Sequence, residues 1–140
     1  MDIPIAVGDV VDPMVTAMIG KGLSAHNLEA TGYSDSLPLA VLAHDPATGA
    51  VLGGAIGRTS LGVMFLNSFP LPREVRGNGL GTRILLAFED EGRRRGCTSG
   101  FLYTISFQAP AFYERNGWSR FGEIPCEPPG ASRIFLRKSL

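Results

Sequence analysis

The sequence feature that most constrains this chain is a glycine-rich turn that opens an amphipathic helix. Three glycines alternate with Asn78 and Leu80 between Gly77 and Gly81, and apolar residues then recur at helical spacing as far as Gly96. A helix that begins in such a turn presents unpaired backbone N–H groups at the positive end of its dipole. Glycines also let an anion approach the main chain without meeting a Cβ atom. The turn therefore predicts an anion-binding site of the kind that holds phosphate groups.

Two common nucleotide-binding patterns do not match this turn. A P-loop requires a lysine directly after its last glycine, whereas Gly81 is followed by Thr82. The dinucleotide pattern GxGxxG requires its third glycine one residue later than Gly81. For the loop taken by itself, a tight strand-to-helix turn without a ligand stays open as the alternative.

Composition and charge set the broad class of protein. The chain has 140 residues, of which 44% are hydrophobic and 19% charged, and we expect a single folded domain over residues 1–140. Its 13 Lys and Arg balance its 13 Asp and Glu, so nucleic acid is a poor candidate for a partner. Its apolar runs fall short of the ~20 residues that cross a bilayer, so we expect no membrane partner.

The N-terminus and the cysteines point to the compartment. Residues 1–5 lack the basic start and the long apolar stretch of a signal peptide. Cys97 and Cys126 form neither a CxxC motif nor a disulfide framework, which favours the reducing cytoplasm. With only two histidines, both scattered, the sequence shows no metal-ligand spacing, and we expect no metal.

The pattern of elements predicts a mixed α/β domain. Asp12 and Pro13 indicate the start of a helix that Gly20 and Gly22 interrupt, and the polar residues 27–36 indicate a loop. Strands are expected at 37–44, 50–57, 61–69, 100–106, 121–124 and 133–136, the first two forming a hairpin, with a short helix at 110–116. The third strand runs into Pro70 and Pro72, which cannot donate to a sheet, so pairing should stop or splay there.

Two motifs in order resemble the GNAT superfamily of N-acetyltransferases. The pattern Arg76-x-x-Gly79-x-Gly81 is similar to that superfamily's acyl-coenzyme A pyrophosphate loop, which follows its fourth strand. The segment from Ala109 to Trp118 is similar to its second signature, a tyrosine on a short helix before a glycine–aromatic pair. The tail, at residues 106–108, 128–130 and 133–138, resembles a branch of small bacterial members. The resemblance covers residues 61–140 and is thin before residue 37.

This resemblance implies a fold and an activity. The fold would be a central mixed, mostly antiparallel sheet, flanked by helices and splayed between the fourth and fifth strands. The activity would be transfer of acetyl from acetyl-coenzyme A to a primary amine, by direct attack in a ternary complex. We expect a small-molecule acceptor, because 140 residues leave little surface for reading a peptide. The alternatives are a non-catalytic module that binds acyl-coenzyme A and a regulatory GNAT-fold protein. Residues 1–11 are a poor first strand, which a homodimer partner could supply.

The resemblance also assigns the site. The pyrophosphate would bind main-chain N–H groups in one loop, at Arg76, Gly77, Asn78, Gly79, Gly81 and Thr82. The pantetheine arm would lie between Phe69 and Leu71 on one side and Leu102 to Thr104 on the other, with Ser106 where the family more often has asparagine. Tyr113 stands at the family's general-acid position, its alternative being a core aromatic. The main-chain N–H of Leu71 is the candidate oxyanion donor.

The general base is left open. Residues 61–69 contain no Asp or Glu, although Asn67 can hold a water molecule. Candidates in segments that could line the acceptor side are His26, Glu29, Asp35, His44, Glu123 and Glu127. Each of them is also consistent with a solvated surface group.

Overall fold

The computed structural model describes all residues from Met1 to Leu140, and they divide into two compact units, Met1–Ser34 and Asp35–Leu140. The first unit contains one helix, α1 (Pro13–Thr31). Asp12 caps it, since its Oδ1 accepts the Met14 amide hydrogen at 2.8 Å, and Gly32 ends it with a φ of 84°.

The sequence-based expectation for this helix was wrong in its second half. Neither Gly20 nor Gly22 interrupts α1, and residues 27–31, expected as loop, continue it to Thr31. A glycine inside a helix costs only about 1 kcal/mol relative to alanine, which lowers helix stability without ending the helix. The stop comes where Gly32 adopts the left-handed conformation.

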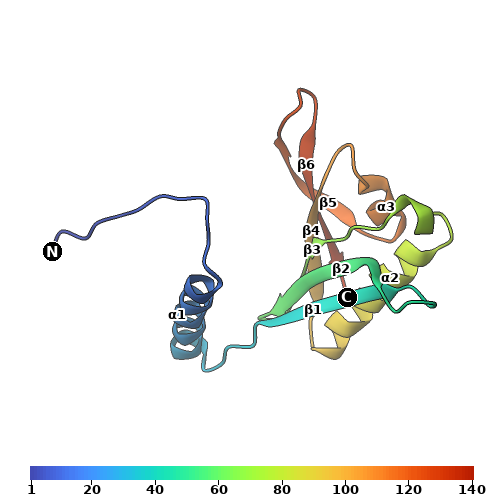
Figure 1. Ribbon diagram of the computed structural model, residues 1–140. Helices are drawn as coiled ribbons and strands as arrows, with labels where there is room; N and C mark the ends of the chain where they lie inside the picture. Colours follow the sequence, from blue (N-terminus) through green and yellow to red (C-terminus); the bar gives the residue numbers. More distant parts are fainter. The chain divides into compact units, whose positions relative to one another are not determined.

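The second unit is built on a six-stranded sheet (Figure 1). Its strands are β1 (Leu37–His44), β2 (Val51–Ser60), β3 (Val63–Ser68), β4 (Ser99–Ile105), β5 (Ser119–Pro125) and β6 (Ser132–Ser139). Their order across the sheet is β1-β2-β3-β4-β6-β5, and every neighbouring pair is antiparallel except β3 with β4. The mixed, mostly antiparallel α/β fold is confirmed, and so is the β1–β2 hairpin. The strand ends differ from the expected ones by a few residues.

Two helices belong to this unit. The helix α2 (Leu80–Arg94) packs against β1, β2 and β3, and the short α3 (Pro110–Arg115) packs against β5. The apolar face of α2 meets alternate residues of the strands, which form the core with it: Ile84, Leu85 and Phe88 from the helix, and Met64, Leu66, Leu102, Ile134 and Leu136 from the sheet. One face of the sheet thus forms the core with α2.

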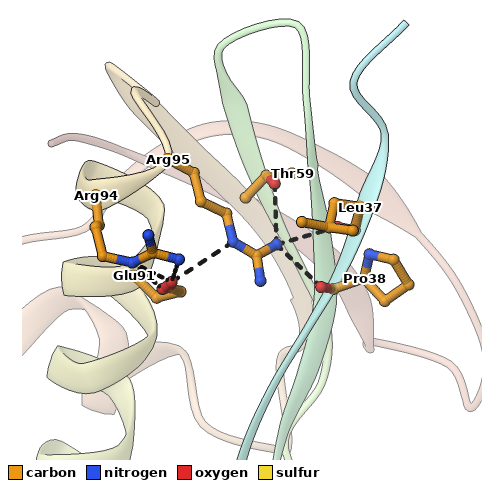
Figure 2. A network of polar contacts seen from close by, with 6 residues as sticks. All are labelled: Leu37, Pro38, Thr59, Glu91, Arg94 and Arg95. Atoms are coloured by element: carbon orange, nitrogen blue, oxygen red, sulfur yellow. Dashed lines mark hydrogen bonds and ion pairs between the residues drawn. The ribbon is translucent and has the colours of Figure 1, made fainter.

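The C-terminal end of α2 is tied to the sheet by Arg95 (Figure 2). One guanidinium nitrogen donates to the backbone oxygens of Leu37 at 3.3 Å and Pro38 at 2.9 Å, and to Thr59 Oγ1 at 3.2 Å. Gly96 then ends the helix with a φ of 86°, as expected from the sequence. Because the end of α2 is attached to β1 and β2, the direction in which its N-terminus points is set. No helix in the structure combines the length and the hydropathy that spanning a membrane requires.

Candidate functional site

The sheet opens between β3 and β4. The two strands pair only from Val63 with Ser99 to Leu66 with Leu102, and β4 then continues to Ile105 with β6 as its one remaining partner strand. Beyond β3 the chain turns away, and the Pro70 carbonyl accepts the Gly54 amide hydrogen of β2 at 3.1 Å. The opening is part of a cleft with a volume of about 1000 Å³. Prolines without an N–H explain why β3 does not follow β4 to its end.

Most of the residues singled out in the sequence meet at this cleft. Those that line it are Phe69, Leu71, Arg76, Gly77, Gly79, Gly81, Thr82, Leu102, Tyr103, Thr104 and Tyr113. Asn78 and Ser106 do not line it. Asn78 Oδ1 accepts the Leu80 amide hydrogen at 3.2 Å, and Ser106 Oγ accepts that of Ser132 at 3.0 Å. These two side chains thus have local structural partners.

The glycine loop has the backbone shape of an anion site. Gly77 and Gly79 adopt φ values of 86° and 83°, and Gly79 is the N-cap of α2. The amide hydrogens of Gly77, Gly79, Gly81 and Thr82 have no acceptor within the protein. Arg76 differs from the expectation, because its own amide already donates to the Arg73 carbonyl at 3.2 Å. Four predicted donors in one loop therefore stay available to a ligand.

Leu71 stands at the other side of this loop. The Arg76 side chain donates from Nε to the Leu71 carbonyl oxygen at 2.7 Å, which joins the segment after β3 to the glycine loop. The Leu71 amide hydrogen has no acceptor within the protein. The residue predicted as oxyanion donor thus lines the cleft with a free N–H group.

Tyr113 lies in the wall of the cleft and in the core at once. Its side chain is 8% exposed, and its ring meets Phe112 and Trp118 edge-to-face, with centroids 5.2 and 6.3 Å away. Burial raises the pKa of the phenol to about 12. Tyr113 therefore stays protonated at neutral pH. Tyr113 is thus both a core aromatic residue and part of the cleft wall.

Thr104 lines the cleft, but its hydroxyl already has partners. It donates to Gln108 Oε1 at 3.3 Å and accepts from the Ala109 amide at 3.5 Å. Gln108 Oε1 also accepts the Ile105 amide hydrogen at 2.9 Å, which closes the loop after β4. Sequence reasoning missed Gln108 in the cleft, because no spacing marks a side chain that folds back on its own loop.

The search for a general base changes with the structure. Within Asp35–Leu140, no Asp, Glu or His side chain lines the cleft. Asp35 accepts the Leu61 amide hydrogen at 2.9 Å, and His44, Glu123 and Glu127 lie outside the lining. His26 and Glu29 belong to α1, in the other unit. Asn67 does line the cleft.

The charged side chains of the cleft are all cationic. Arg76, Arg115 and Arg133 line it, and none of them forms an ion pair within the chain. Such a cleft, with free amides at a helix N-terminus, fits an elongated polyanion that carries an apolar arm. The structure contains no group of three or more His, Cys, Asp and Glu side chains arranged for a metal ion.

Comparisons with known proteins agree with this geometry. Residues 22–118 match the acetyltransferase (GNAT) family. The chain is 30% identical to an acetyltransferase of Agrobacterium fabrum, over 94% of this chain and 96% of that protein. It is 33% identical to the blasticidin-S acetyltransferase of Streptomyces morookaense, over 66% of this chain and 68% of that protein.

Solved structures share the fold. A protein from Agrobacterium tumefaciens described as an acetyltransferase superposes with a TM-score of 0.86 at 29% identity, covering 99% of this chain and 100% of that one. A more distant one from Bacillus anthracis, described as a streptothricin acetyltransferase, was crystallised with acetyl-coenzyme A; its TM-score is 0.58 at 14% identity, covering 66% and 58% of the two chains.

The fold and the family match together define the class of protein, an enzyme that transfers acetyl groups. The chain belongs to the GNAT family of acetyltransferases.

Proposed function

We propose that this enzyme transfers acetyl from acetyl-coenzyme A to a primary amine of a small molecule, by direct attack in a ternary complex. The observation that carries the proposal is the row of free amides at the start of α2, which opens on the same cleft as Tyr113. The similarity to a blasticidin-S acetyltransferase favours a small-molecule acceptor. A homodimer and a cytoplasmic location stay predictions from the sequence.

The glycine loop is the proposed holder of the coenzyme's diphosphate. Gly77, Gly79, Gly81 and Thr82 would donate their free amides, and Arg76 would add positive charge. Phe69 and Leu71 form the wall along which the apolar arm would lie, opposite Thr104. Acetyl-coenzyme A, once bound, supplies the acetyl group as a thioester. The Bacillus anthracis structure supports the choice of this donor.

Leu71 and Tyr113 are the proposed catalytic groups. The free amide of Leu71 would stabilise negative charge that develops on the carbonyl oxygen. The Tyr113 hydroxyl would protonate the departing sulfur. Complete transfer from a phenol with a pKa of about 12 to a thiolate of pKa ~8.5 is uphill by roughly 5 kcal/mol. The Tyr113 proton should therefore move only late, as the carbon–sulfur bond breaks and the sulfur gains negative charge, and the proton that the attacking nitrogen loses would restore the phenol.

The acceptor must reach the site as a neutral amine, because only that form has a free lone pair. No carboxylate or imidazole of Asp35–Leu140 lines the cleft to remove its proton. We therefore expect the rate to rise with pH toward the pKa of the amine, which is ~10.4 for a lysine-like group.

Release of free thiol from acetyl-coenzyme A tests the proposal directly. Wild-type enzyme with a panel of small primary amines should release thiol, and Tyr113→Phe should release it at least ~10-fold more slowly at saturating substrate. The control Tyr33→Phe makes the same change at an exposed ring that does not line this cleft. Tight binding of acetyl-coenzyme A without any thiol release would instead support a binding module.

A further inference from the structure

The cleft extends to the second face of the sheet, and Arg133 stands there. Arg133 lies near the start of β6, paired with Ile105 of β4 and Ile124 of β5. Its neighbour Ile134 belongs to the core with α2, so alternation along the strand places Arg133 on the opposite face. Tyr103, between buried neighbours on β4, faces the same way. Both residues nevertheless line the cleft, so the cleft passes through the opening between β3 and β4.

Arg133 is a cation without a counter-charge in the chain. It forms none of the ion pairs of the structure, and its guanidinium carbon lies 5.9 Å from the centroid of the Tyr103 ring. Stacking on an aromatic face holds a guanidinium in place while its N–H groups stay free for another partner. Tyr103 is 42% exposed, so this pair is open to solvent. Arg76, in contrast, already donates to the Leu71 carbonyl.

If the proposed function holds, the two faces of the sheet receive different substrates. The free amides of Gly77, Gly79, Gly81 and Thr82 lie at the start of α2, on the face that α2 covers. The diphosphate and its arm enter from that face. An amine that attacks the thioester must approach from a direction that the coenzyme leaves free. That direction is the second face, where Arg133 and Tyr103 stand.

We propose that the acceptor amine carries a carboxylate, which Arg133 binds beside the Tyr103 ring. The acceptor would thus be an amino acid or another small amine with an acid group. A guanidinium presents two parallel N–H donors that match a carboxylate. A polycationic acceptor would meet like charge from Arg133, with no acidic side chain of Asp35–Leu140 in the lining to offset it. This inference rests on the proposed function.

Matched acceptors test it. Initial rates of thiol release would be measured for L-amino acids and the corresponding L-amino-acid amides, with wild type, Arg133→Gln and Arg133→Lys. The control Arg137→Gln removes an arginine from the same strand and the same face, outside this cleft. Comparing each acceptor between wild type and variant cancels the different pKa values of the amines.

We expect Arg133→Gln to lower kcat/KM about 10- to 100-fold for the acids and less than about 2-fold for the amides, as loss of a charged hydrogen bond predicts. Arg133→Lys should retain part of the preference, and Arg137→Gln all of it. A second readout is calorimetric binding of N-acetyl amino acids to the enzyme with free coenzyme A, which Arg133→Gln should weaken by a similar factor.

Several outcomes overturn the inference. Equal losses for acids and amides, or a KM for acetyl-coenzyme A that rises with every acceptor, would assign Arg133 to the coenzyme. Thiol release with no dependence on the carboxylate would leave the proposed function intact and remove only this inference. If no amine supports thiol release from acetyl-coenzyme A, the proposed function is wrong. The calorimetric measurement would then still show whether Arg133 binds a carboxylate.

Discussion

Glu89 Oε1 lies 2.6 Å from Lys138 Nζ, and the Glu89 side chain is fully buried. The other oxygen of this carboxylate accepts from Trp118 Nε1 at 3.4 Å, and the lysine also donates to the Asn116 carbonyl at 2.8 Å. The pair therefore joins α2 and β6 to the turn after α3. A six-residue helix such as α3 has little stability of its own. Support for Tyr113 thus comes from this buried contact, because the Trp118 amide donates to the Tyr113 carbonyl at 3.1 Å.

Breaking this pair should destabilise the protein strongly. Lys138→Ala leaves the buried Glu89 carboxylate with only the more distant Arg93, 3.6 Å away, and Glu89→Ala leaves the largely buried Lys138 without a carboxylate. We expect each change to lower the free energy of unfolding by ~3–5 kcal/mol, measured with urea. The double variant Glu89→Leu/Lys138→Met removes both charges and should recover most of the loss. The exposed pair of Glu114 and Arg120 is the control, and Glu114→Ala should change stability little. Similar effects at the two pairs would contradict this account.

Tyr113 should make the stability fall at alkaline pH. Burial raises its pKa from 10.0 to about 12, so the unfolded chain releases the phenolic proton first as the pH rises. The contribution is fully present below pH ~10 and is lost between pH ~10 and ~12, to a total of roughly 2 to 3 kcal/mol. Tyr113→Phe should lack this component, whereas Tyr103→Phe should keep it. Urea titrations at several pH values measure it, and parallel pH curves for wild type and Tyr113→Phe would refute the assignment.

Gly79 should be required for the coenzyme as well as for the fold. Its φ of 83° is costly for alanine, and Gly130 has a similar φ of 91° away from the cleft. Both Gly79→Ala and Gly130→Ala should lower stability by about 1–2 kcal/mol. Only Gly79→Ala should also raise the KM for acetyl-coenzyme A, by roughly 10-fold, because alanine favours a negative φ that would turn the amide hydrogens of the loop away from the diphosphate and weaken a charge-assisted hydrogen bond. An unchanged KM in Gly79→Ala would show that the loop does not bind the coenzyme.

Arg95 and Arg94 are neighbours with different expected effects. Arg95→Met leaves the Leu37 and Pro38 carbonyls and the Thr59 hydroxyl without their donor (Figure 2), and we expect a loss of about 1–3 kcal/mol in unfolding free energy. Arg94 pairs only with Glu91 on the exposed side of α2, so Arg94→Met should have no measurable effect. The hydrogen bond from Arg94 lowers the pKa of Glu91, so that side chain stays ionised. Equal losses in the two variants would contradict the tie to β1 and β2.

Much of the fold could be predicted because its signals are local. The Asp12 cap, the hairpin turn after β1 and the glycine at the end of α2 each depend on residues a few positions apart. The same holds for the glycine loop, whose two positive φ values need residues without a Cβ. The length of α1 was missed because single glycines weaken a helix without ending it.

The site could be predicted only in part. Most of the predicted residues line the cleft, but Ser106 and Asn78 have partners elsewhere. The Ser106 hydroxyl and the Asn78 side-chain amide each accept a hydrogen bond from a nearby backbone N–H group. Which N–H group lies nearby depends on how the neighbouring strands end. Gln108 and Arg133 were missed because neither belongs to a motif; their places follow from the loop after β4 and the register of β6.

By itself, the amino-acid sequence determined the backbone shape of the glycine loop and the place of Tyr113 on a short helix. Both are set by backbone conformations and spacings within a few residues. Only the tertiary structure decided that β3 and β4 part after Leu66, that Glu89 is buried against Lys138, and that Arg133 faces the far side of the cleft. These facts depend on strand order and register, which join residues that are distant in the chain and carry no mark of each other in it.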